Sequence, residues 1–141
     1  MPALTLEQAQ SIVSASLAHA RDRGFKPLAV AVLDARGALK AFGAADGTSL
    51  RRGEIAIGKA NGAIGMGVGS RSLGTMAVER PHFVAAAVHA IGPLVPVPGG
   101  VLIAGADGPL GAVGISGETS ENDEAAALAG IAAAGLTAQP G

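Results

Sequence analysis

Two hairpin signals constrain the fold of this chain more than any other feature of its sequence. Residues 28–42 hold two apolar segments joined by the turn Asp34-Ala35-Arg36-Gly37, and residues 101–115 hold two more joined by Ala106-Asp107-Gly108-Pro109. Asp, Gly and Pro favour tight turns, and a tight turn connects only antiparallel neighbours. The sequence therefore predicts an antiparallel sheet, and its second strand is expected to end at Asp46-Gly47.

Helical segments precede, separate and follow these hairpins. Thr5 and Gln8 form a capping-box pattern, and apolar residues then recur at helical spacing up to Gly24. Ser49 is expected to cap a second helix from about Leu50, and Ser120 to cap a final helix through about Ala134. Further helices are predicted after Ser70 and at Pro81. Helices packed on an antiparallel sheet define an α+β fold, and a single domain is expected over residues 1–141.

Charged side chains are too few to cover a free monomer of this size. They make up 15% of the 141 residues, while 49% are hydrophobic; soluble domains carry roughly 25% charged residues. Part of the apolar fraction is Ala, which weakens the contrast but does not remove it. We therefore expect a homo-oligomer with buried interfaces between subunits.

The charge pattern and the absence of cysteine exclude several classes of function. The net charge is −1, and no run of basic residues exceeds Arg51-Arg52, so nothing indicates nucleic-acid binding. With no cysteine, the chain has no disulfides, no thiolate metal site and no cysteine nucleophile.

No membrane segment or export signal is expected. Residues 83–106 contain no charged side chain, but Pro93, Pro96 and Pro98 interrupt them and would break a membrane-spanning helix. The first residues lack the basic and unbroken apolar segments of a signal peptide, so a cytoplasmic location is predicted.

Lys59, Asp46 and Gly99-Gly100 are the first candidate site residues. Lys59 lies among apolar residues, where its ammonium would hold an anion or, with a lowered pKa, act as a base. Asp46 would pair with it as a carboxylate, and Gly99-Gly100 would offer consecutive amides to an anion. The alternatives are a lysine whose stem covers apolar surface, a simple turn at Asp46, and a plain loop at Gly99-Gly100.

Glycines crowd the later part of the second predicted helix. Gly58, Gly62, Gly65 and Gly67 each weaken a helix relative to alanine. They indicate either close helix packing or a groove where a flat ligand or another subunit approaches the backbone.

The histidines do not form a metal site within one helix. His82 and His89 are seven residues apart, roughly 10.5 Å along a helix axis, so they cannot chelate one ion together. One of them would instead be an axial ligand or proton carrier, or simply a packed or exposed side chain. His19 falls opposite the apolar stripe of the first helix and is expected in solvent. No metal site is predicted.

Several short motifs occur in one order along nearly the whole chain. They are Pro27–Asp34 with Gly37, Asp46-Gly47, Lys59-Ala60, Pro98-Gly99-Gly100, Gly111–Gly117 and Asp123-Glu124. In this combination the chain resembles the GlcG/HbpS family, which includes the C-terminal domain of PduO-type proteins. The resemblance implies a profilin-like fold, with an antiparallel sheet of about five strands flanked by helices, and assemblies from dimers to octamers.

The resemblance also implies a small-molecule ligand, which in some members is haem or a related tetrapyrrole such as a corrinoid. The predicted pocket lies between subunits, and its residues are Lys59, Gly99, Gly100, His89 and Gly62. Two positions depart from the family pattern. Ala44 stands where an arginine is common before Asp46, and Gly62 stands where a threonine is common.

A small enzyme of the isomerase or lyase type is the alternative hypothesis. Lys59 or a histidine would move a proton on a small carboxylate or carbonyl substrate, with Asp46 as the partner of Lys59. The Gly99-Gly100 amides would then hold a carboxylate or enolate.

Overall fold

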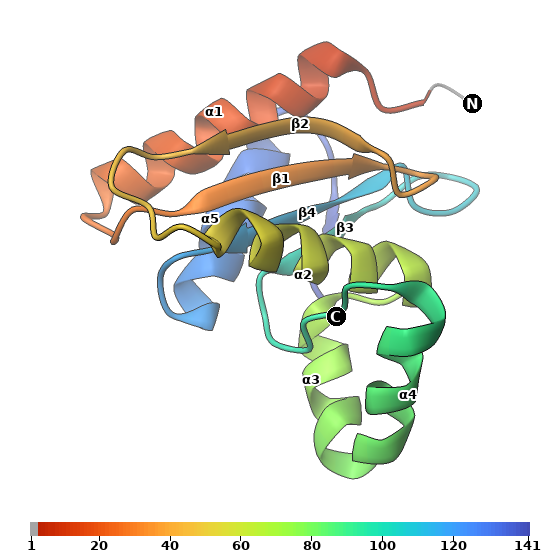
Figure 1. The fold of residues 1–141 in the computed structure, drawn as a ribbon. Helices are drawn as coiled ribbons and strands as arrows, with labels where there is room; N and C mark the ends of the chain where they lie inside the picture. Colours follow the sequence, from red (N-terminus) through yellow and green to blue (C-terminus); the bar gives the residue numbers. More distant parts are fainter. Residues whose placement is uncertain (1–2) are drawn as a thin grey trace.

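One antiparallel sheet organises residues 3–141, the part of the chain that this computed structural model describes. Its five strands lie in the order β2-β1-β4-β3-β5 (Figure 1). The strands are β1 (Ala29–Asp34), β2 (Leu39–Ala44), β3 (Gly100–Ile103), β4 (Gly111–Ser116) and β5 (Ala138–Gln139). All four strand pairings are antiparallel, which confirms the predicted α+β fold and both hairpins.

Helices cover both faces of the sheet. They are α1 (Leu6–Asp22), α2 (Arg52–Met66), α3 (Ser70–Glu79), α4 (Pro81–Ile91) and α5 (Ser120–Ala133). Figure 1 shows α1 and α5 on one side of the sheet, α2 on the other, and α3 and α4 as a helical hairpin that projects from the body. No helix within residues 3–141 has the length and apolar character needed to cross a bilayer.

Strand β1, which lies between β2 and β4, is buried on both of its faces, because helices lie above and below it. Val30 and Val32 join the main core with Ile12 of α1 and Ile131 of α5. The alternate residues of β1, Ala29 and Ala31, pack against α2. Small residues on the α2 side allow that helix to approach the strands closely.

The predicted helix starts are partly right. Thr5 and Gln8 form the capping box that begins α1. Ser49 does not cap α2, which begins at Arg52 without any side-chain cap. At α5 the capping side chain is Thr119, which accepts a hydrogen bond from the Asn122 amide, so Ser120 is the first helical residue rather than the cap.

Two strand predictions also change. The second strand ends at Ala44, before the turn at 46–47. The resemblance implied about five strands, but the residue pattern did not locate β5, because two residues are too few to show the alternation that identifies a strand.

Candidate functional site

Lys59 is the largest fully buried side chain near the sheet, and it forms an internal ion pair. Its residue exposure is 1%, and so is that of Asp123 in the first turn of α5. Lys59 Nζ donates to Asp123 Oδ2 at 3.0 Å and to the Ile115 carbonyl oxygen at 2.8 Å. The lysine therefore ties α2 to β4 and to the start of α5.

The buried carboxylate of Asp123 is also held from its other side. Its Oδ1 accepts a hydrogen bond from the Glu118 amide at 3.0 Å, in the turn that leads into α5. Burial raises the pKa of Asp123, and the Lys59 ammonium opposes that shift. Burial also lowers the pKa of Lys59, with the Asp123 carboxylate opposing it. Each charge is therefore tolerated mainly because the other is present.

This geometry corrects the predicted pairing of Lys59 with Asp46. Asp46 is an exposed residue of the turn after β2, whereas the partner of Lys59 is Asp123. Since both members of the pair are sealed from solvent, Lys59 does not meet a substrate in this conformation. The roles of base and anion holder that the sequence suggested for Lys59 are therefore not supported by its position.

Gly99 and Gly100 do lie beside Lys59, as the sequence suggested, but they serve packing. A Cβ on Gly99 would lie 2.8 Å from Lys59 Nζ, and one on Gly100 would collide with the Lys59 carbonyl oxygen. The Gly100 amide donates to Ser70 Oγ at 2.7 Å, so it is not free for an anion. The prediction that the Gly99 and Gly100 amides together bind an anion is therefore wrong for the Gly100 amide.

Gly62 has the same packing role on another side of α2. A Cβ there would lie 2.9 Å from Leu94 Cγ and 3.1 Å from Leu73 Cδ1. Of the two explanations for the helix glycines, close packing is the one that Gly62 fits.

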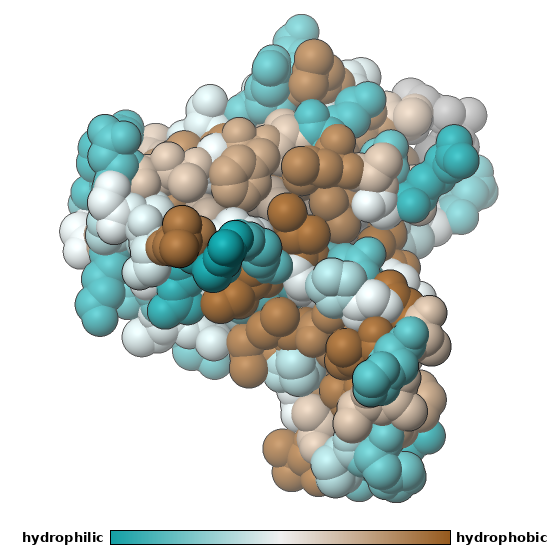
Figure 2. Space-filling view, viewed as in Figure 1, coloured by the Kyte–Doolittle hydropathy of each residue, from teal (hydrophilic) through white to brown (hydrophobic). Residues whose placement is uncertain are grey.

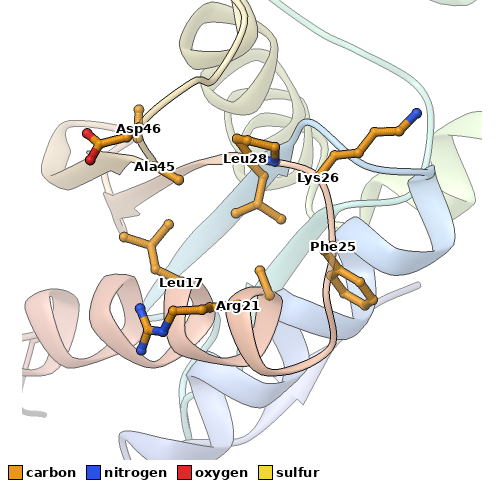
Figure 3. A pocket seen from close by; sticks show the side chains of 10 residues that line it. Leu17, Arg21, Phe25, Lys26, Leu28, Ala45 and Asp46 are labelled. Carbon is orange, nitrogen blue, oxygen red and sulfur yellow. The ribbon is translucent and has the colours of Figure 1, made fainter.

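A groove opens elsewhere, between α1 and the end of the sheet where β1 begins and β2 ends. Its volume is about 490 Å³. The lining residues are Leu17, Ala20, Arg21, Phe25, Lys26, Pro27, Leu28, Ala44, Ala45 and Asp46. Figure 3 shows Leu17, Leu28 and Ala45 directed toward the space between α1 and the strand, with Arg21 on the helix side and Asp46 opposite. Of the predicted site residues, Asp46 alone lines this groove.

None of the histidines lines the groove or is hydrogen-bonded to the ion pair. His89 is exposed on α4, in the projecting hairpin. His19 is not simply in solvent as predicted: its Nε2 is buried without a hydrogen-bond partner among the described residues. Its ring contacts that of Phe25 edge-on, with the ring centres 5.8 Å apart.

The sequence contained a signal that could have identified Asp123 as a buried residue. Asp123 shares a helix face with Ala126, Ala127 and Gly130, all of which are buried. A carboxylate on that apolar stripe indicates a side chain that points inward and needs a buried cation. No pattern in the sequence indicated that Arg21 and Lys26 line a groove, because the groove forms only when α1 packs beside the turn after β2.

A five-stranded antiparallel sheet between helical layers, with a groove beside one end of the sheet, defines a class of small α+β domains. Within that class, the chain belongs to the family described as Haem degrading protein HbpS-like, whose model matches residues 4–132. No curated protein is similar enough in sequence to count as a match.

Solved structures agree with the family assignment. A PduOC:heme complex has 25% sequence identity and a TM-score of 0.86, with 96% of this chain and 98% of that chain covered. HbpS has 26% identity and a TM-score of 0.82, over 94% and 90% of the two chains. Klebsiella pneumoniae protein ORFY, at 21% identity and a TM-score of 0.84 over 93% and 90%, supports the fold alone.

Proposed function

We propose that this protein binds haem or a closely related tetrapyrrole in the groove between α1 and the turn after β2. The observation that carries the proposal is the composition of the groove: an apolar floor with two cations beside it. The similarity to a PduOC:heme complex supports the choice of ligand class.

The floor of the groove suits a flat apolar ring. Leu17, Leu28 and Ala45 point into it, and Phe25 and Pro27 extend the apolar lining. Its volume of about 490 Å³ lies within the roughly 300–1,000 Å³ that is usual for small-molecule sites. Burial of ring surface against these side chains would supply most of the binding free energy.

Two cations border this floor. Arg21 lies on the α1 side, and Lys26 is exposed at the other end of the groove. Figure 3 shows the Lys26 ammonium directed away from the floor, so this side chain would have to turn to meet a ligand. Carboxylates of a tetrapyrrole would pair with them, while Asp46 on the opposite rim would repel carboxylates. The ligand is therefore expected to direct its acidic edge toward Arg21 and Lys26.

The lining residues fit the organic part of haem better than its iron. Haem iron is usually held by His, Cys, Met or Tyr, and none of the ten residues that line the groove is of these types. His19 contacts Phe25 edge-on but is not among the residues that line the groove. The proposal therefore rests on ring burial and carboxylate pairing. The pocket between subunits that the sequence predicted was placed at Lys59 and Gly99-Gly100, not at this groove, and it stays a prediction.

Titration with hemin and with metal-free protoporphyrin IX tests this proposal. We expect a saturable Soret change with both, at similar affinity, because iron coordination contributes little. Arg21→Glu should weaken both about tenfold, which corresponds to about 1.4 kcal/mol.

Arg23→Glu is the matched control, because Arg23 is exposed at the end of the same helix but does not line the groove. It should leave both affinities within a factor of two or so. The absence of any saturable change in the wild type, or an equal loss in the two variants, would reject this groove as the site.

A further inference from the structure

The longest continuous part of the groove lining is the segment between α1 and β1. Residues 25–28 supply four of the ten lining residues and belong to neither a helix nor a strand; we call them the groove wall. Lys26 and Pro27 are exposed, and Figure 2 shows mainly hydrophilic and neutral groups (teal and white) at the left end, where α1 ends and β1 begins in Figure 1. Apolar packing covers little of the groove wall from outside, so its position depends on hydrogen bonds.

Glu118 holds the groove wall from the side of α5. Its Oε2 accepts a hydrogen bond from the Lys26 amide at 2.8 Å, and its Oε1 accepts one from the Thr119 amide at 2.9 Å. These bonds lower the pKa of the Glu118 carboxyl, so the group is ionised at neutral pH and both bonds are charge-assisted. Because proline has no amide hydrogen, Lys26 carries the only backbone donor of residues 26–27.

A second contact joins the groove wall to the turn before α5. Gly117 has a φ of +150°, and a Cβ there would collide with the Pro27 carbonyl oxygen and lie 2.5 Å from Leu28 Cα. From the other side, the Ala45 amide donates to the Leu28 carbonyl oxygen at 3.0 Å. The groove wall is therefore held between two turns, and Glu118 belongs to one of them.

Glu118 is itself tied to the buried ion pair. Its amide donates to Asp123 Oδ1 at 3.0 Å, and Asp123 Oδ2 accepts from Lys59 Nζ at 3.0 Å. A continuous series of contacts therefore runs from α2 through Asp123 and Glu118 to the backbone of Lys26. The series begins at two side chains that are sealed from solvent, which gives Glu118 a fixed anchor.

We propose that Glu118 is a positioning residue of the groove: it fixes the Lys26 backbone, and with it the groove wall, where a tetrapyrrole would lie. The inference rests on the proposed function and adds to it a residue that does not line the groove. A wall that is already in place does not have to be ordered when the ligand binds, so less binding free energy is lost. Without the carboxylate, the Lys26 amide loses its acceptor and the ligand must order the groove wall itself.

The negative charge of Glu118 by itself would have the opposite effect. A carboxylate near the groove repels the carboxylates of a tetrapyrrole, so the removal of that charge alone should strengthen binding. The direction of the change in affinity therefore distinguishes positioning from electrostatics.

Titration of Glu118→Ala with hemin tests the inference. We expect the Kd to rise about tenfold, because the groove wall must then be ordered on binding. Glu118→Gln should raise the Kd about threefold, since its amide oxygen still accepts one of the two bonds, without charge. Asp22→Ala is the matched control: Asp22 is an exposed carboxylate next to Arg21 and does not line the groove. Its Kd should stay the same or fall, because only a negative charge is lost.

Amide hydrogen exchange of the ligand-free protein provides a second measurement that does not involve haem. The Lys26 amide should exchange at least about fivefold faster in Glu118→Ala than in the wild type. The Phe25 amide donates to the Ala20 carbonyl oxygen at 2.9 Å, so it serves as the internal reference and should keep its exchange rate.

The outcomes separate this inference from the proposed function. An unchanged Lys26 exchange rate, or a Glu118→Ala variant that binds hemin as tightly as the wild type or more tightly, would overturn the positioning role alone. A wild type that binds no hemin would overturn the proposed function, and the positioning role with it. Circular dichroism would verify that Glu118→Ala is folded; should it be unfolded, the hemin affinity of Glu118→Gln decides, and a Kd at or below the wild-type value would count against Glu118.

Discussion

Asp123→Ala should lower the free energy of unfolding by about 3–5 kcal/mol, measured by urea denaturation of the purified protein. The substitution leaves the Lys59 ammonium buried at 1% exposure without its carboxylate partner. It also removes the acceptor of the Glu118 amide at the start of α5. The remaining contact, to the Ile115 carbonyl oxygen, does not neutralise the charge.

Two further variants separate the ion pair from a general effect of losing an acidic residue in α5. Glu121→Ala removes an exposed carboxylate from the same helical turn, where it pairs with Arg71. That loss should cost less than about 1 kcal/mol, because exposed pairs contribute little. Lys59→Met with Asp123→Leu should recover most of the stability, since no unpaired charge is left. A loss below 1 kcal/mol in Asp123→Ala would show that this pair is not needed.

Much of the fold could be predicted because its signals are local. The hairpin at residues 28–42 depends on a turn and two apolar segments that are neighbours in the sequence, and the structure places β1 beside β2. The capping box of Thr5 and Gln8 is equally local. The pairing of β1 with β4 and the short β5 depend on contacts between distant segments, which no local pattern specifies.

The site was predicted less well, and the reason is physical. The sequence placed Lys59 correctly beside Gly99 and Gly100 but could not say which side of α2 faces the sheet. An exposed aspartate near a helix start interacts favourably with the helix dipole, whereas an aspartate that points inward can pair with a buried cation. The position of Asp123 in the sequence was compatible with both environments. Only the packing of α5 against β4 decides between them.

Gly114→Ala should be the most damaging of the glycine substitutions that we consider, with a loss of about 3 kcal/mol or more in urea denaturation. Gly114 is paired with Gly100 across β4 and β3, under α2. A Cβ on Gly114 would collide with the Ala56 carbonyl oxygen and lie 2.9 Å from the Ala60 amide nitrogen. Both obstacles are backbone atoms, so α2 as a whole must move away from the sheet.

Displacement of α2 would also disturb Lys59, which reaches Ile115 and Asp123 only because its helix lies so close to β4. Gly65→Ala is the matched control on α2 itself, because the nearest atom to a new Cβ is the flexible end of Ile91 at 3.3 Å. Alanine is a better helix former than glycine by about 0.5–1 kcal/mol, so this variant should be neutral or slightly more stable. If Gly114→Ala instead unfolds within 1 kcal/mol of the wild type, close contact between α2 and β4 is not what holds the buried ion pair in place.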